Sequence, residues 1–206
     1  MTAGDMTILA EKTISPGFAD PAIDSQRVFR AMLEAMARPG TIVDVPAAVE
    51  APAPLDAATA ALLLMLVDHD TPVWFDPAAG SAAALAWVRF HCGSPVAAAP
   101  EGAAFAVIAD PVAMPPLGAF HAGSDEYPDR SATLIVQVPS LAAGAPWRLE
   151  GPGIRDHAVL AVAGIPPVFT DWVRANHDLF PRGVDLVFAS GTRIAALPRS
   201  TRLGGG

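Results

Sequence analysis

The chain has 206 residues, of which 52% are hydrophobic and 17% charged, and its formal net charge is −8 at pH 7. This apolar fraction excludes a disordered chain, and the length favours one globular domain. The acidic balance argues against a nucleic-acid binder, which needs a basic face to neutralise phosphates. A single cysteine excludes a disulfide scaffold, a four-cysteine zinc site and an iron–sulfur cluster held by this chain alone.

The sequence shows neither a membrane-spanning segment nor a secretory signal. No segment offers the roughly 18 uncharged apolar residues that a membrane span needs. The first residues include Asp5 and Glu11 but no basic stretch before an apolar one, so we expect no secretory signal and a cytoplasmic protein. We predict a flexible arm over 1–17, a single domain over 18–203 and a disordered tail over 204–206.

Helical and strand-like segments alternate in the first half of the chain. A helix is predicted from Asp24 or Ser25, either of which could cap it, to about Arg38, where Pro39-Gly40 stops it. The apolar segment 55–67 is predicted to be a buried helix because it has no polar face. The other elements expected here are strands at 41–45, 71–75 and 104–109, and a helix over 81–92 that ends at Gly93.

The second half begins with a loop over 110–131, rich in proline, glycine and acidic residues. Strands are predicted at 133–138 and 147–150, and the two could form a wide hairpin. A helix over 166–178 and a closing hairpin of 184–189 with 193–197 follow. This order predicts an α/β fold, a single domain with an open mixed sheet flanked by helices.

Several catalytic motifs are absent from the sequence. It has no G-x-x-x-x-G-K-[ST] phosphate loop, no G-x-S-x-G nucleophile elbow and no H-E-x-x-H zinc pair. A Schiff base with pyridoxal phosphate needs a lysine amine, and the only lysine, Lys12, lies in the predicted arm. We therefore expect no cofactor and no metal.

Asp68-His69-Asp70 places two carboxylates and an imidazole beside a predicted strand. The D-x-D spacing could hold a hard cation. The competing interpretation is a solvated turn in which Asp70 bonds nearby backbone amides.

Arg89-Phe90-His91-Cys92 places an imidazole next to the only thiol. Adjacent helical residues point about 100° apart, so His91 is poorly placed to activate Cys92. Arg89 and His91 instead suit the last turn of a helix, where cations complement the helix dipole, or the binding of an anion or a partner.

Two further segments have a structural and a functional interpretation. Gly151-Pro152-Gly153 could bring backbone amides near a phosphate, but it has no third glycine and no clear following helix, so a tight turn is favoured. Arg199 and Arg202 follow the last predicted strand and form the most basic spot of an acidic chain. They belong to a solvated tail or dock onto an acidic partner.

Seven strings resemble one family in order and spacing. They are FRAMLEAMARPGTI (29–42), LLLMLVDHDTPVWF (62–75), VRFHCGSP (88–95), ATLIVQVPSL (132–141), LEGPGI (149–154), FPRGVDLVF (180–188) and IAALPRSTRL (194–203). The family is PhnH, the H subunit of the bacterial carbon–phosphorus lyase machinery for phosphonate metabolism. The resemblance covers nearly the whole chain.

The resemblance implies a fold similar to a reduced pyridoxal-phosphate-dependent transferase that has lost its cofactor. It also implies a homodimer in isolation and a complex with the G, I and J subunits, with which an L subunit associates. With G, I and L, the family supports displacement of adenine from MgATP by an alkylphosphonate. The product is a ribose 1-alkylphosphonate 5-triphosphate, and the iron–sulfur cysteines belong to the J subunit. No catalytic residue can be transferred from the family to this chain.

Two hypotheses of different classes follow. The first is a non-catalytic subunit that carries interactions within a phosphonate-degrading complex. The second is a catalytic or ligand-binding subunit with its own nucleotide or phosphonate pocket around Asp70, Arg89, His91 and Asp185. Arg199 is a further candidate for contact with a ligand or partner.

Overall fold

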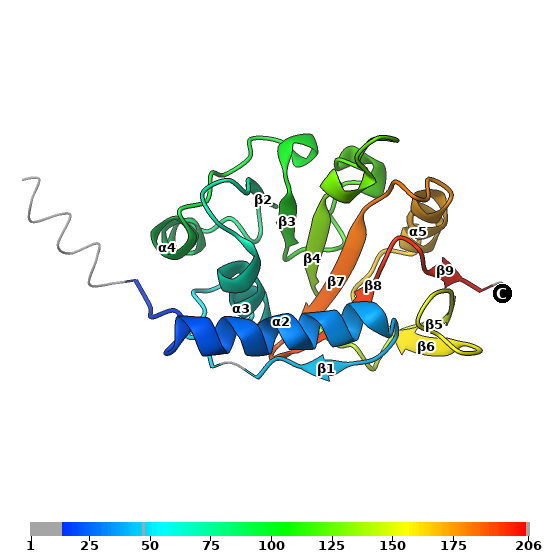
Figure 1. The fold of residues 1–206 in the computed structure, drawn as a ribbon, viewed down its shortest axis with the longest axis horizontal. Coiled ribbons are helices and arrows are strands. Elements are labelled where there is room, and N and C mark those ends of the chain that lie inside the picture. The colour runs from blue at the N-terminus through cyan, green and yellow to red at the C-terminus, as the bar shows by residue number, and fades with distance from the viewer. Residues whose placement is uncertain (1–13, 47, 205–206) are drawn as a thin grey trace, which may run out of the picture.

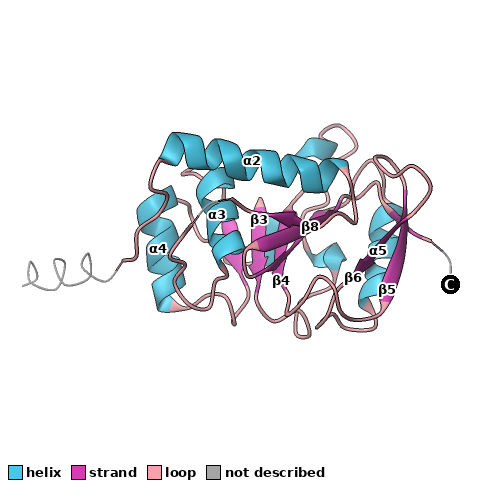
Figure 2. Ribbon diagram, turned by 90° about the horizontal axis from the view of Figure 1, so that it is seen from below, coloured by secondary structure: helices cyan, strands magenta, loops and turns pink. Residues whose placement is uncertain are grey.

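The structure is a computed structural model that describes residues 14–46 and 48–204. Strands occupy the middle of the molecule, with α3 and α4 on one side and α5 on the other (Figures 1 and 2). The four α-helices are α2 (Pro21–Ala37), α3 (Ala57–Leu66), α4 (Ala82–Cys92) and α5 (Phe169–His177). Single 3₁₀ turns lie at η1 (Pro100–Gly102), η2 (Leu117–Ala119) and η3 (Pro128–Arg130).

A six-stranded mixed sheet forms the centre, in the order β1-β8-β7-β4-β3-β2. The four strands β2, β3, β4 and β7 run parallel, with β2 at one edge, and on the other side β8 pairs antiparallel with β7 and β1 pairs antiparallel with β8. Their bounds are β1 Val43–Asp44, β2 Val73–Phe75, β3 Phe105–Ile108, β4 Thr133–Gln137, β7 Asp185–Ser190 and β8 Arg193–Leu197. The predicted single α/β domain with an open mixed sheet is confirmed.

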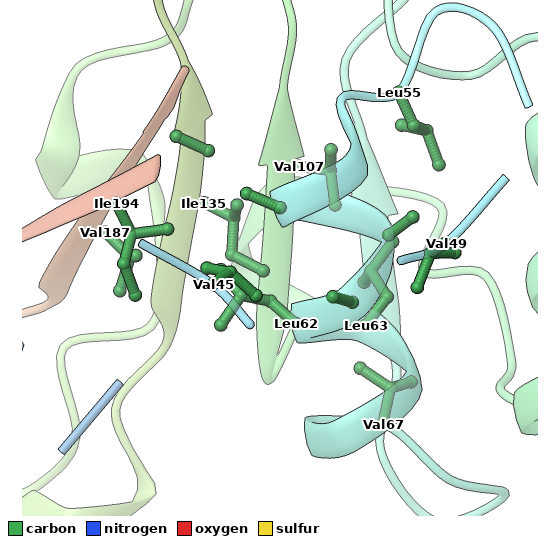
Figure 3. Close-up of a cluster of buried hydrophobic side chains, with 14 of the residues drawn as sticks. Val45, Val49, Leu55, Leu62, Leu63, Val67, Val107, Ile135, Val187 and Ile194 are labelled. Atoms are coloured by element: carbon green, nitrogen blue, oxygen red, sulfur yellow. The ribbon is translucent and has the colours of Figure 1, made fainter. Parts of the chain in front are cut away.

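Each face of this sheet is covered by its own apolar cluster. On one face α2, α3 and α4 pack against alternate strand residues such as Val107 and Ile135. Leu62 and Leu63 of α3 are fully buried there (Figure 3), and each such burial contributes about 1.5–3 kcal/mol. On the other face Leu134 and its neighbours pack against α5 and the segment around η2. Burial on both faces explains why the parallel strands are continuous apolar runs.

The first helix begins earlier than the sequence pattern suggests. Asp20 is the N-cap, and its carboxylate accepts the N–H of Ile23 at 3.1 Å. Pro21 occupies the first turn, where its missing N–H costs nothing, so the helix begins there. The prediction that Asp24 or Ser25 caps it was wrong.

The hairpin considered between 133–138 and 147–150 does not form. β4 pairs with β3 and β7, whereas β5 (Pro146–Glu150) belongs to a separate three-stranded sheet with β6 (Ala158–Ala161) and β9 (Arg202–Leu203). The sequence analysis missed β6 and β9, and Arg202 lies in β9 rather than in a tail. This small sheet packs on the α5 side of the core through Leu149 and Leu160.

The predicted terminal segments fall partly within the described residues. Residues 1–13, including Lys12, lie outside them, but the carbonyl of Ser15 is hydrogen-bonded to α4. Gly204 donates its N–H to the carbonyl of Arg148 at 2.7 Å, and 205–206 lie outside the described residues. No helix in the described ranges is both long and apolar enough to cross a membrane.

Candidate functional site

Asp185 and Arg199 are the two predicted residues that the fold brings into direct contact. Asp185 opens β7, and Arg199 follows the end of β8 by two residues. The hairpin register pairs Leu186 with Leu197, so the chain returns past Asp185 as it leaves β8. The pair therefore lies at the end of the sheet where the parallel strands begin.

The two side chains form a largely buried ion pair. The Arg199 guanidinium donates to Asp185 through Nη2 at 2.5 Å and Nε at 3.1 Å, and the Arg199 main-chain N–H donates to the same carboxylate at 2.8 Å. The side chains are only 16% and 14% exposed, respectively. Arg199 Nη1 also donates to the carbonyl of Pro128 at 2.6 Å, which fixes the residues around η3. The prediction that Arg199 lies in a solvated tail was wrong.

A cavity of about 460 Å³ opens over this pair. Phe180, Met36 and proline side chains supply apolar walls, and Asp129 and Ser200 supply the remaining polar groups. Asp185 already accepts three hydrogen bonds, so its carboxylate is poorly suited to act as a general base. Three of the five guanidinium N–H groups are used, which leaves two able to donate to an oxygen atom. The arrangement suits binding better than proton transfer.

Arg89, His91 and Cys92 lie elsewhere, in the last turn of α4, which ends at Gly93 in the left-handed conformation as predicted. His91 stacks near Trp87, and its Nε2 lies 3.0 Å from the carbonyl oxygen of Ser15. Burial raises the pKa of Cys92 to about 11, and its thiol faces the carbonyl of Leu63 at 3.8 Å. The structure therefore gives no support to a Cys–His nucleophile.

The turn between α3 and β2 is organised by Asp68. Its carboxylate accepts the N–H of Asp70 at 3.0 Å and the hydroxyl of Thr71, and these hydrogen bonds lower the pKa of Asp68. The Asp70 side chain is 83% exposed and lies beside His69. A turn was the favoured interpretation, but assigning the backbone-bonding role to Asp70 was wrong.

The hypothesised pocket of Asp70, Arg89, His91 and Asp185 is thus not assembled. Asp185 lines the cavity described above, Arg89 lines a different groove along α4, and Asp70 lines neither of them. Among the described residues there is also no group of three or more His, Cys, Asp or Glu able to hold a metal ion.

The Gly151-Pro152-Gly153 segment forms the favoured tight turn. The N–H of Ile154 donates to the carbonyl of Gly151 at 3.1 Å. Gly153 has φ +80° and lies so close to α2 that a Cβ there would stand 2.0 Å from the carbonyl oxygen of Ala37.

A buried polar group that was not predicted from the sequence lies at the opposite end of the sheet, where the parallel strands finish. Asp76 is 3% exposed, and its carboxylate accepts the N–H groups of Ala79, Ala109 and Asp110. These bonds join the end of β2 to the end of β3. The available signal was an acidic residue directly after an apolar strand.

Gln137 plays a similar part at the end of β4. Its Oε1 accepts the N–H of Asp56 at 2.6 Å, and its Nε2 donates to the carbonyl of Pro54 at 3.1 Å. A second cavity, of about 360 Å³, lies here between Asp56, Asp110 and Gln137. The signal that could have revealed it was one amide within the apolar run LIVQV.

Comparisons with known proteins agree with the resemblance seen in the sequence. Residues 16–204 match the family model described as bacterial phosphonate metabolism protein (PhnH). The chain is 43% identical over 189 residues to the alpha-D-ribose 1-methylphosphonate 5-triphosphate synthase subunit PhnH of Rhizobium meliloti (strain 1021), covering 92% of this chain and 94% of that relative. It is 41% identical over 81 residues to HtxG of Stutzerimonas stutzeri, provisionally named a C–P lyase subunit protein, covering 39% and 42% of the two chains. The chain therefore belongs to the PhnH family of bacterial phosphonate metabolism proteins.

Proposed function

We propose that this chain is the PhnH subunit of an enzyme complex that makes alpha-D-ribose 1-methylphosphonate 5-triphosphate. The observation that carries the proposal is the 43% identity to the Rhizobium meliloti subunit of that name, which extends over 94% of the relative. The match covers 92% of this chain, and all the strings that carry the resemblance lie within the matched residues 16–204.

The proposed reaction exchanges a base for a phosphonate at the ribose of MgATP. A phosphonate oxygen forms a bond to C1 of the ribose, the bond from C1 to adenine breaks, and adenine leaves with a proton. We propose that this chain supports the step together with the G, I and L subunits. Another subunit of the machinery later performs the radical cleavage of the carbon–phosphorus bond.

We propose a non-catalytic role for this chain within the complex. Two observations support that role. The carboxylate of Asp185 already accepts three hydrogen bonds from Arg199, and burial raises the pKa of the Cys92 thiol to about 11. The competing function, a ligand-binding subunit, is favoured by the two unused N–H groups of Arg199 beneath a cavity of about 460 Å³.

The proposed partners are a second copy of the chain in isolation, and the G, I and J subunits in a cytoplasmic complex with which L associates. Exposed apolar side chains on α2 support the presence of an interface: Ile23, Phe29 and Leu33 are 48%, 48% and 50% exposed. When a partner covers such side chains, apolar surface leaves water and the free energy of the system falls. We also propose that the fold is related to that of pyridoxal-phosphate-dependent transferases, in a reduced form that has lost the cofactor.

Reconstitution with variants separates the two roles. Asp70→Ala, Arg89→Ala, His91→Ala and Arg199→Ala are each combined with the G, I, J and L subunits, and both incorporation and turnover are measured. A non-catalytic subunit predicts that turnover falls only in proportion to incorporation. Normal incorporation with a loss of about a hundredfold or more in rate, the effect of removing an acid–base group, would contradict it. Failure of the unmodified chain to incorporate would contradict the assignment to the complex.

A further inference from the structure

An apolar groove runs along the outer side of α4 at the end of the molecule where the central sheet stops. It has a volume of about 810 Å³. Leu85, Ala86 and Phe90 of α4 form one wall, and segment 94–96 forms the other. Phe90 is 62% exposed and Val96 is 52% exposed. Two large apolar side chains that line the same open groove are thus exposed to water, which is unfavourable.

The second wall of the groove is an open sheet edge. Segment 95–97 lies beside β2, the edge strand, through hydrogen bonds from Val73 N–H to the Pro95 carbonyl at 3.0 Å and from Ala97 N–H to the Val73 carbonyl at 2.9 Å. Backbone groups of successive residues in an extended chain point in opposite directions. The N–H and C=O of Val96 therefore face outward, and neither has a hydrogen-bond partner among the described residues. One more extended segment fits beside them.

The N-terminal segment of this chain begins at this groove. Ile14 lines it, and the carbonyl oxygen of Ser15 accepts the indole N–H of Trp87 on α4 at 3.0 Å. His91, one turn further along α4, places Nε2 3.0 Å from the same oxygen. The chain is thus held against α4 at residue 15, and Ile14, the first residue that the structure describes, lines the groove.

The composition of that segment complements the groove. Residues 6–10 read Met-Thr-Ile-Leu-Ala, and the acidic residues Asp5 and Glu11 flank them. On the groove side, Arg89 is exposed and forms no ion pair with any described residue. The N-terminal segment is also long enough to run along the whole groove. Ala82 and Phe90 are about 12 Å apart along the helix axis, whereas eight extended residues span roughly 26 Å.

We propose that residues 6–11 of the same chain occupy the α4 groove as an extended segment beside residues 95–97. Leu9 covers Leu85 and Phe90, and the carboxylate of Glu11, two residues on and therefore on the same face of the segment, pairs with Arg89. The segment protects the edge of the sheet formed by residues 95–97, which otherwise offers a template for pairing with other chains. A partner that needs this edge would have to displace the segment.

Disulfide trapping tests the proposal in the full chain. Leu9→Cys is combined with Val96→Cys, and the control combines Leu9→Cys with Val112→Cys, a residue that is 70% exposed on the loop after β3. The half-buried Cys92 is retained in both. After mild oxidation at low protein concentration, we expect at least a fivefold higher yield of the intrachain disulfide in the first variant than in the control. Equal yields would overturn the proposal, and a predominantly interchain disulfide would show that a second copy supplies the segment.

A charge exchange tests the contact between Glu11 and Arg89. In the trapping variant, Glu11→Arg is expected to lower the disulfide yield several-fold, and adding Arg89→Glu is expected to restore it. If neither substitution changes the disulfide yield, Glu11 and Arg89 do not form an ion pair, and the proposed register of the segment is wrong. Circular dichroism checks that each variant is folded. Because no readout depends on turnover, failure here leaves the proposed synthase role unaffected.

Discussion

At the scale of single residues, the ion pair of Asp185 and Arg199 is expected to have a large effect on stability because both side chains are mostly buried. Arg199→Ala leaves a buried carboxylate without its cation and frees the carbonyl of Pro128. Breaking a buried pair costs about 3 kcal/mol or more, so we expect a loss of that size in the free energy of unfolding, measured by urea denaturation.

Arg174→Ala is the matched control. It removes a pair with Asp171 of similar length, 3.0 Å, but the two side chains are 50% and 71% exposed. Exposed pairs contribute little, so the loss is expected to stay below about 1 kcal/mol. Equal losses in the two variants would mean that the environment of Arg199 is not as buried as described.

The turn between α3 and β2 allows a prediction about pH. Hydrogen bonds from the Thr71 hydroxyl and the Asp70 N–H hold the pKa of Asp68 below its ordinary value of 3.8. A carboxylate with a lowered pKa stabilises the folded state above 3.8, and this contribution is lost as the pH falls through the folded-state pKa. Asp68→Ala is therefore expected to destabilise the protein at pH 7 and to lose this effect in acid.

Asp70→Ala serves as the comparison in the same denaturation series. The Asp70 side chain is 83% exposed and lies beside the similarly exposed His69, so little change in stability is expected at pH 7. If Asp70→Ala destabilised the protein more than Asp68→Ala at pH 7, the Asp70 side chain would be the one that stabilises the turn, as the sequence first suggested.

At the scale of elements, the approach of the 151–153 turn to the end of α2 requires glycine. A methyl group at position 153 would stand 2.0 Å from the Ala37 carbonyl oxygen, and φ is +80° there. Gly153→Ala is therefore expected to cost at least about 2 kcal/mol in thermal or chemical unfolding. Gly102→Ala, where a Cβ would meet no atom within 4 Å, is expected to change stability by less than about 0.5 kcal/mol.

The elements that could be predicted from the sequence are those with a local signal. The parallel strands are apolar runs bounded by turn residues, and the β7–β8 hairpin has its turn at Gly191. The elements that could not be predicted depend on distant residues. β9 is two residues long and pairs with β5, about fifty residues earlier, and nothing near Arg202 indicates that partner.

In the candidate site, too, single residues could be identified from the sequence, but the contacts between them could not. Asp185 and Arg199 were each identified as charged residues worth attention, but their contact depends on the register of the β7–β8 hairpin, which a pattern of residue types does not fix. Conversely, Asp70, Arg89 and His91 are neighbours of apolar segments in the sequence, yet they lie outside the cavity that Asp185 and Arg199 share.

At the scale of the whole molecule, the exposed apolar side chains on α2 bear on the oligomeric state. We expect the purified chain to be a dimer, with twice the 21.2 kDa mass of one chain. Covering Ile23, Phe29 and Leu33 would provide part of the driving force. Multi-angle light scattering at micromolar concentration gives the mass directly, and a value of one chain mass would contradict the proposed homodimer.

The assignment to the synthase is tested most directly by adenine release. Purified G, I and L subunits are incubated with MgATP and methylphosphonate, with and without this chain, and free adenine is measured over time. We predict that release requires this chain and that Lys12→Ala, which removes the only lysine, leaves the rate unchanged. Adenine release at the same rate without the chain would contradict its place in the synthase.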